Sequence, residues 1–510
     1  MPDAAASNRS NLPRHRTWNF PLTADRIVSV LRRPATAIAF LALTAETVTA
    51  DLLYFRRGGE VQLPARREGS RWILDAPGGP VAFEATDFRK VFPHNDPRSG
   101  WPARSAASRP DDVGARFALA WWALENGLTA EATATLREVH KVSPSFEPVK
   151  SLIKKLDAVT PPLEDPETGG LTSALKVAFR TSRSPHFLLF HQGSEEEASE
   201  RLMLIEQVYI TYYLTLAGQG LDLPGPRRRL AGAVFTSRDD YLAFLRRENA
   251  PAYATTMGYY HPTRDLVVAY DPRDQPAYRT SLTALEGRRR ELAMWGRTIE
   301  QMPKDARLRV EAAGEPERVL GRQAAHTWHE AVGRDLARQS LLLDLQRRSL
   351  AFGMAAHETI HQLAAVSSLA PRHRDFPTWL HEGLAAQFEV VRGGRWAGFG
   401  HAHDLRLQDW RSIHLSPRLA PIVRDEGFGE GYRKDLYAEA WALVFFLRKV
   451  HPREFAGFLD LLRAPDASGR GEGRVALDHF RTAFGADLSV LESEWHRFMR
   501  TVETPLVQLQ

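Results

Sequence analysis

Two histidines four residues apart, with a glutamate beside the first, have the types and spacing that metal chemistry requires. They are His357, Glu358 and His361, in the segment Ala-His-Glu-Thr-Ile-His-Gln. In a helix, positions four apart lie on the same face, so both imidazoles can bind one ion. Glu358 lies one position round from His357, where a general base for a metal-activated water belongs. This spacing predicts a zinc-dependent hydrolytic site.

A third ligand is expected, because a catalytic zinc ion usually has three protein ligands and one open position. Glu382 is the candidate, in the segment Trp-Leu-His-Glu-Gly-Leu-Ala of a second helical pattern. His381 should point about a hundred degrees away from Glu382, so we do not expect it to be a ligand. Glu389, two turns beyond Glu382, either orients a zinc-bound histidine or is solvated. Gly393 and Gly394 are expected to end this helix.

The helix that carries the two histidines is predicted from Arg348 to Val366 by its apolar stripe. Alanines beside the stripe keep its flanks thin, so the helix of Glu382 can approach closely. Residues 281–347 before it are charged and helix-forming, which indicates an inserted helical arm. Beyond Gly394 we expect a short helix at Leu405–Trp410, an apolar helix at Leu436–Val450 and a terminal group of helices.

A mixed sheet should lie against the metal-binding helices. Apolar runs predict strands at His186–His191 and Leu230–Phe235, and a hairpin over residues 257–270. Helical patterns at residues 195–216 and 238–245 separate these strands. Strand, helix, strand and hairpin in this order favour an α+β domain whose sheet is covered on one side. Residues 171–510 are therefore expected to form the functional domain.

The chain before residue 171 divides into smaller units. A double arginine, an apolar run and small residues within residues 1–50 predict an export signal and leader, and hence a periplasmic or extracellular bacterial protein. Glycine pairs between short alternating runs predict a small β-barrel or sheet module over residues 51–93. Residues 94–112 have no periodicity and indicate a linker. Residues 113–158 predict a helical hairpin, similar to one tetratricopeptide unit, that packs on a neighbouring domain.

Composition limits the kinds of site that the chain can form. The sequence has no cysteine, so a metal must be held by histidine and carboxylate. A hydrophobic share of 43% with 25% charged residues is ordinary for a soluble globular protein. The 67 Lys and Arg against 62 Asp and Glu leave a charge of only +5, and no basic run alternates with aromatics. We therefore expect no nucleic-acid partner and no stable membrane span, while the oligomeric state stays open.

These motifs carry a resemblance to a known group. His357 to His361, with Glu382 in a Trp-x-x-Glu-Gly-x-Ala setting, resembles the gluzincin metallopeptidases, which include thermolysin and the zinc aminopeptidases. With Tyr437 opening the motif Tyr-x-x-Ala-Trp-Ala-Leu-Val, the chain from about residue 180 to 500 looks closest to an uncharacterised bacterial family of peptidase-MA-like domains. The resemblance implies a zincin-like fold, with His357, His361 and Glu382 as Zn²⁺ ligands and Glu358 as base and proton shuttle.

A hydrolase of this group also needs a donor that stabilises the oxyanion. Tyr437 is the candidate, because it opens a helix where aminopeptidase-like members of the group keep such a tyrosine. His401, His403 and His414 are the rival candidates. The alternative for Tyr437 is an ordinary core or capping role.

We expect a zinc endopeptidase that acts on a peptide or protein substrate. No Gly-x-Met-x-Asn segment that would bind a free amino terminus is present, so exopeptidase action is unsupported. Two alternatives stay open. One is an envelope binding or scaffold protein that zinc only stabilises, and the other is a zinc amidase acting on a cell-wall amide with the same ligands.

Overall fold

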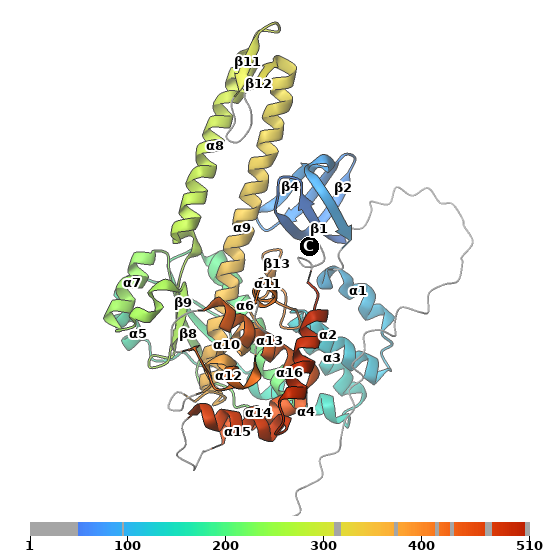
Figure 1. Cartoon of the computed structure of the whole chain (residues 1–510), viewed down its shortest axis with the longest axis vertical. Coiled ribbons are helices and arrows are strands. Elements are labelled where there is room, and N and C mark those ends of the chain that lie inside the picture. Colours follow the sequence, from blue (N-terminus) through green and yellow to red (C-terminus); the bar gives the residue numbers. More distant parts are fainter. Residues whose placement is uncertain are drawn as a thin grey trace, which may run out of the picture. The chain divides into compact units, whose positions relative to one another are not determined.

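The computed structural model describes residues 49–93, 96–310, 318–371, 376–413, 418–428, 433–464 and 472–504. Most of the expected export segment lies outside these ranges. All described residues belong to one compact unit, residues 48–510, which has a mixed α+β fold (Figure 1). No described helix is both long and apolar enough to cross a bilayer.

The N-terminal module is an open antiparallel sheet in the order β4-β3-β2-β1-β5. A barrel, one of the two forms expected here, is wrong, because β4 and β5 remain the two edges of the described sheet. One face is apolar and packs on Leu341 of the long helix α9. The strands are β1 (Thr49–Phe55), β2 (Glu60–Glu68), β3 (Arg71–Ala76), β4 (Gly79–Glu84) and β5 (Phe88–Pro93).

Four helices follow, where a linker and a hairpin were expected. They are α1 (Pro97–Ala107), α2 (Val113–Glu125), α3 (Thr129–Val142) and α4 (Glu147–Val159). The linker expectation is wrong for α1, whose first turn is capped by Asp96 and whose Trp101 stacks on Trp122 at 6.4 Å between ring centroids. The additional helix α4 buries Val149, Leu152 and Leu156 in a cluster that includes Leu214 of the next domain. Packing on a neighbour therefore stabilises this group, as a short helical unit requires.

The second sheet has the order β6-β7-β8-β10-β9, with β7, β8 and β10 parallel and the outer strands antiparallel. Both faces are covered, which corrects the expectation of one covered side. Helices α6 and α9 cover one face, while α5 and α7 cover the other. Fully buried strands such as Phe187–His191 need this arrangement because both of their faces are apolar. The elements are β6 (Arg180–Arg183), β7 (Phe187–His191), β8 (Leu230–Phe235), β9 (Gly258–His261), β10 (Leu266–Tyr270), α5 (Gly169–Leu175), α6 (Glu195–Gly218) and α7 (Arg238–Arg247).

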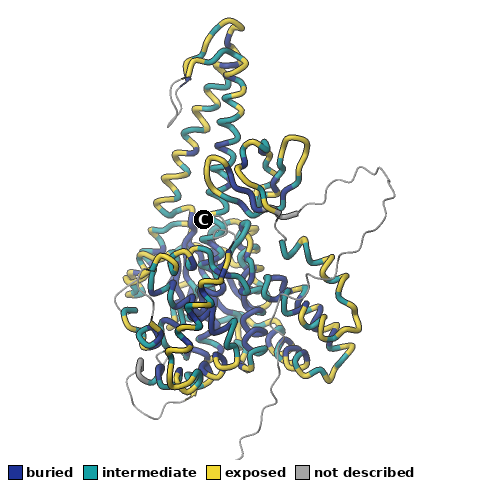
Figure 2. The backbone as a smooth tube through the Cα atoms, turned by 45° about the vertical axis from the view of Figure 1, so that its right-hand side comes forward, coloured by how far each residue is buried: buried dark blue, intermediate teal, exposed yellow. Residues whose placement is uncertain are grey.

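The charged insertion is a helical arm that runs directly into the metal-binding helix. Helix α8 (Pro276–Gln301) lies beside α9 (Arg322–Val366), and the strands β11 (Arg307–Val310) and β12 (Arg318–Gly321) join them (Figure 1). The predicted start of the metal-binding helix at Arg348 is wrong. Its burial changes there from a mostly half-buried arm to a largely buried segment, but the helix itself is continuous (Figure 2).

The C-terminal part is largely helical, as expected. Helix α10 ends at Ala386, well before Gly393 and Gly394, so these glycines do not end it. They form the turn of a two-stranded hairpin and both have positive φ, 55° and 70°. A Cβ on Gly393 would overlap the backbone oxygen of Gln62. The elements are α10 (Thr378–Ala386), β13 (Val391–Arg392), β14 (Arg395–Trp396), α11 (Asp404–Arg411), α12 (Leu419–Val423), α13 (Lys434–Val450), α14 (Pro452–Arg463), α15 (Glu472–Phe484) and α16 (Ser489–Thr501).

Candidate metal centre

Three donor groups from two helices converge on one point. His357 and His361 lie one turn apart on α9, and Glu382 faces them from α10; one ligand atom of each lies within 4.8 Å of the others. The Nε2 atoms of the histidines are 3.0 Å apart, and the Glu382 oxygens lie 3.2 Å and 3.6 Å from them. Ligands about 2.0 to 2.1 Å from a tetrahedral zinc ion are about 3.3 Å apart. The donor set and its spacing could therefore hold a metal ion.

Glu389 orients the first of these histidines. Its Oε1 accepts a hydrogen bond of 2.6 Å from Nδ1 of His357, which leaves Nε2 directed at the metal position. The Glu389 side chain is only 14% exposed, so the solvated alternative is wrong. Ligating histidines generally use their second nitrogen in this way, and the hydrogen bond fixes tautomer and ring orientation. Orienting a histidine is one of the two roles that the sequence analysis offered for Glu389.

The Glu389 carboxylate is itself held by two further groups. Nε2 of His403 lies at 3.1 Å and the guanidinium of Arg406 at 3.4 Å. Burial would raise the pKa of Glu389, but the charge of Arg406 and the hydrogen bonds from His357 and His403 hold it well below its usual value. His403 therefore supports the centre indirectly and is not free to contact a substrate oxyanion.

His401, another rival candidate, is not among the converging donors of this centre. His401 lies at 3.1 Å from Asn126, on the helical group before the sheet. His414 lies outside the described residues. Neither therefore gains support as an oxyanion donor.

His381 supports the second ligand, a role that the sequence analysis missed. Its Nε2 lies 3.0 Å from Nδ1 of His361, on the side opposite the metal position. Burial lowers the pKa of His381 to about 4, so the ring is neutral and can accept the Nδ1 hydrogen of His361. It is not one of the three converging donors, as expected. Helical spacing gave no signal for this contact, because it depends on how α10 crosses α9.

The positive charge of the centre is concentrated on His357 before a metal binds. Burial alone would lower its pKa, but hydrogen bonds to Glu382 and Glu389 outweigh burial and raise the pKa well above the usual value. For His361, burial and the neighbouring His381 and His357 lower the pKa well below the usual value. One imidazole is thus protonated between two carboxylates and the other is neutral.

Glu358 lies in the same cleft but is not one of the three converging donors. Burial raises its pKa to about 7, while the charge of His357 acts in the opposite direction. Its carboxylate accepts a hydrogen bond from the backbone N–H of Tyr260 in β9, which fixes it between the sheet edge and the metal ligands. A carboxylate held beside the metal position with a pKa near neutrality suits a general base.

Close helix packing sets the position of Glu382. The carboxylate of Asp425 accepts hydrogen bonds from the backbone N–H groups of Thr378 (2.6 Å) and Trp379 (2.8 Å), and so caps α10. Next to Glu382, a Cβ at Gly383 would lie 2.6 Å from the backbone oxygen of Ala440 in α13. The glycine therefore allows α10 and α13 to approach each other and fixes the depth of Glu382.

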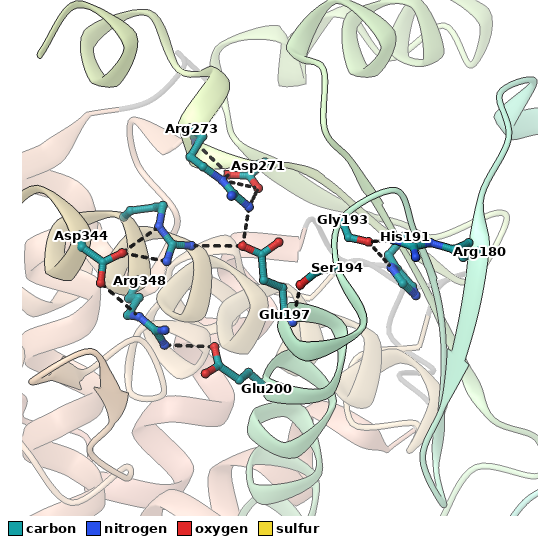
Figure 3. Close-up of polar contacts among 11 residues, drawn as sticks. Arg180, His191, Gly193, Ser194, Glu197, Glu200, Asp271, Arg273, Asp344 and Arg348 are labelled. Atoms are coloured by element: carbon teal, nitrogen blue, oxygen red, sulfur yellow. Dashed lines mark hydrogen bonds and ion pairs between the residues drawn. The ribbon is translucent and has the colours of Figure 1, made fainter. Parts of the chain in front are cut away.

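Helix α9 is anchored to the sheet and to α6. The buried side chain of Gln362 donates to the backbone oxygens of Ala231 (3.2 Å) and Asp265 (2.9 Å). Further toward the arm, ion pairs fix α9 against α6 and the end of β10 (Figure 3). Arg348 of α9 lies 3.0 Å from Glu200 of α6, and Glu197 of α6 binds Arg273. These contacts hold the metal-binding turn of α9 against a rigid base.

The donors line a cleft of about 1070 Å³ beside strand β9, the free edge of the second sheet. Tyr437, the predicted oxyanion donor, lines it, with its ring 5.6 Å from the guanidinium of Arg406. Tyr253 lines it from a 3₁₀ turn at Pro251–Thr255, stacks on Tyr259 at 4.3 Å between ring centroids, and is 40% exposed.

Tyr253 is a second tyrosine near the reacting groups, and the sequence analysis did not identify it. Burial raises its pKa, and the carboxylates of Glu358 and Glu382 raise it further. Its phenol is therefore electrostatically close to both Glu358 and Glu382. A tyrosine in an irregular turn has no spacing signal that could have revealed it.

Comparison with known proteins finds a match for one segment of the chain. Residues 352–465 match a domain family described as a protein of unknown function (DUF1570). The matched segment contains all three converging donors, Glu358 and Tyr437. No curated protein and no solved structure matches the chain. The family assignment therefore carries no activity with it.

Proposed function

We propose that this protein is a zinc-dependent endopeptidase of the gluzincin type. The observation that carries the proposal is the convergence of His357, His361 and Glu382 at zinc-ligand spacing, with Glu358 beside them in an open cleft. A structural zinc site is closed by four protein ligands, whereas a catalytic one leaves a position open. The arrangement of a sheet beside two metal-binding helices also agrees with a zincin-like fold.

The chemistry divides between the metal and the side chains around it. Zinc, when bound, would supply a Lewis acid and lower the pKa of a water molecule. Glu358 would accept the proton of the attacking water and pass it to the nitrogen of the leaving amine. Its fixed hydrogen bond to the Tyr260 N–H keeps the carboxylate oriented during both transfers.

Two tyrosines are placed to stabilise the oxyanion. We assign this role to Tyr437 and Tyr253, which line the cleft from α13 and from the 3₁₀ turn before β9. A phenol can donate a hydrogen bond to a developing oxyanion, and such donors are worth several kcal/mol in a water-poor site. Tyr253 has the stronger structural support, because its hydroxyl interacts electrostatically with both Glu358 and Glu382.

The cleft suits an extended polypeptide. Among the described residues β9 pairs only with β10, and an extended chain can add to such an edge strand by main-chain hydrogen bonds. Leu405, 61% exposed, lines the cleft together with Met257 and Phe376. These side chains favour apolar residues near the scissile bond. Export to the cell envelope remains part of this proposal and can be checked by fractionation.

The direct test incubates zinc-loaded protein with a library of peptides from digested proteomes, with the Glu358→Gln variant as control. Cleavage within peptides by the wild type alone would support the proposal, and the cut sites would give the specificity. Cleavage only of cell-wall amides would favour the amidase alternative. Absence of cleavage in both arms, with zinc bound, would contradict the proposal and favour the scaffold alternative.

A further inference from the structure

A second cavity lies on the other side of the β13–β14 hairpin from the metal cleft. It has a volume of about 970 Å³ and is lined by the N-terminal sheet, α1, α13 and α16. Leu52, Gln62, Arg392 and Gly393 contribute to the walls of both cavities. A polypeptide in the metal cleft would therefore pass close to the second cavity. No role has so far been given to this cavity.

Positive charge predominates among the described residues of its wall. Five cationic side chains and three carboxylates line the wall, and one of the cations, Lys449, is already paired with Glu125 at 2.8 Å. Asp75 pairs with Arg66 at 3.5 Å, and Asp96 caps α1. The cationic side chains are Arg98, Arg104, Arg392, Arg395 and Lys449.

Arg98 and Arg395 are the most unusual pair in this wall. Neither makes a hydrogen bond or ion pair with another described residue, although both line the same cavity. Burial lowers the pKa of Arg98, and the positive charge of Arg395 lowers it further, against weaker opposing effects of Asp96 and Glu131. Arg98 is partly buried and Arg395 is exposed, so both guanidinium groups are accessible to an anion in the cavity.

Arg392 adds a buried donor at the boundary between the two cavities. Its side chain is 15% exposed, and its Nε has no hydrogen-bond partner among the described residues. Burial lowers its pKa, with Asp404 acting in the opposite direction. The other guanidinium nitrogens of Arg392 contact His401 and the backbone oxygen of Ala402, so this side chain is held in place at the boundary.

Aromatic side chains complete the wall. Arg104 lies 4.3 Å from the ring of Trp122, and Phe92 is 39% exposed at the rim. Flat apolar surfaces of this kind pack against the stem of an acidic side chain while the arginines bind its carboxylate. The combination is suited to carboxylates on a chain more than to a free inorganic ion.

We infer that this cavity binds an acidic stretch of a polypeptide, with Arg98 and Arg395 as the anchoring cations. The continuity of the cavity with the metal cleft makes that polypeptide the substrate, and this second step rests on the proposed peptidase function. The binding of an acidic stretch does not depend on the peptidase function, because the charge and geometry of the cavity alone support it. The proposed peptidase therefore prefers substrates that carry a cluster of Asp or Glu near the cleavage site.

The test measures binding to the full-length, zinc-loaded protein by isothermal titration calorimetry. The probes are acetylated and amidated tetraglutamate, the matched tetraglutamine, and inorganic phosphate. Tetraglutamate should bind, with an affinity that falls as salt is raised. The double variant Arg98→Ala/Arg395→Ala should weaken it at least about tenfold, whereas Arg98→Lys/Arg395→Lys should retain most of the affinity.

The matched control is Arg67→Ala/Arg89→Ala, which removes two exposed arginines of the N-terminal sheet that line neither cavity. This control should bind tetraglutamate as the wild type does. Equal binding of tetraglutamine, no binding of tetraglutamate, or an unchanged affinity in the Ala double variant would each overturn the inference. If phosphate binds as tightly as tetraglutamate, the cavity is a site for small anions, and the inference of an acidic-polypeptide site is overturned. Arginine-dependent binding by a protein that cleaves no peptide would contradict the peptidase proposal and leave the acidic-stretch site standing.

Discussion

His381 Nε2 lies 3.0 Å from Nδ1 of His361, so one imidazole orients another at the metal centre. His357 has the corresponding partner in the carboxylate of Glu389, at 2.6 Å. The two ligands are thus oriented by groups of different charge. A carboxylate increases the electron density on its histidine, whereas a neutral imidazole mainly fixes the tautomer and the ring position.

Removing this support should weaken zinc binding without unfolding the protein. For His381→Ala we expect a loss of zinc affinity of about 10- to 100-fold, because the His361 ring loses its orienting partner. His381→Gln, whose amide oxygen can accept the same hydrogen, should recover part of it. Competition with a chromophoric chelator measures both. Equal zinc affinity in wild type and His381→Ala would show that the contact does not support the ligand.

Zinc affinity should also depend on pH in a defined direction. The pKa of His357 is raised in the metal-free protein, so this ring carries a proton at neutral pH that zinc must displace. Affinity should therefore rise with pH and level off above that raised pKa. Calorimetry in two buffers with different ionisation enthalpies should detect proton release on binding. Release of no proton near pH 7 would contradict a protonated His357.

Gly383 should be intolerant of a side chain. In Gly383→Ala the new Cβ would lie 2.6 Å from the Ala440 oxygen, which forces α10 and α13 apart and moves Glu382. Overpacking of this kind costs about 1 to 3 kcal/mol, and zinc affinity should fall with stability. The control is Gly457→Ala in α14, where no atom lies within 4 Å and the change should stabilise the helix. Thermal unfolding of the two variants tests this, and equal melting temperatures of Gly383→Ala and Gly457→Ala would contradict the packing argument.

The two tyrosines of the cleft can be separated by removing each hydroxyl. Tyr253→Phe should lower kcat by about 100-fold or more with little change in KM or zinc content, because the lost hydrogen bond forms only in the transition state. Tyr437→Phe should lower kcat to a similar extent if it shares the oxyanion. Tyr278→Phe on the distant helix α8 is the control. An unchanged kcat in Tyr253→Phe would remove that residue from the mechanism.

Local periodicity explains what the sequence could predict. The spacing of His357, Glu358 and His361 requires only that the segment be helical, and a second amphipathic helix was enough to suggest Glu382. The apolar runs of the mixed sheet were likewise visible, because these strands are buried on both faces. These inferences depend on residues that are close together in the chain.

The remainder depends on contacts between distant segments. His381, Arg406 and Tyr253 have no distinguishing spacing, and they reach the centre only because α10, α11 and the turn before β9 surround α9. The unbroken course of α9 was hidden because the charged residues before Arg348 indicated a separate arm, although that part of the helix is half-buried. Helix α1 was missed because its composition is polar and its stability comes from Trp101 stacking on Trp122.

The most direct test of the account is the zinc content and hydrolytic rate of Glu358→Gln, measured on the same preparation. Glutamine keeps the shape of the side chain and the ligands intact but cannot accept the water proton. We predict one zinc per chain, as in the wild type, and a peptide hydrolysis rate at least about 100-fold lower. Full activity with zinc retained would contradict the assignment of Glu358 as the base and the hydrolytic mechanism built on it.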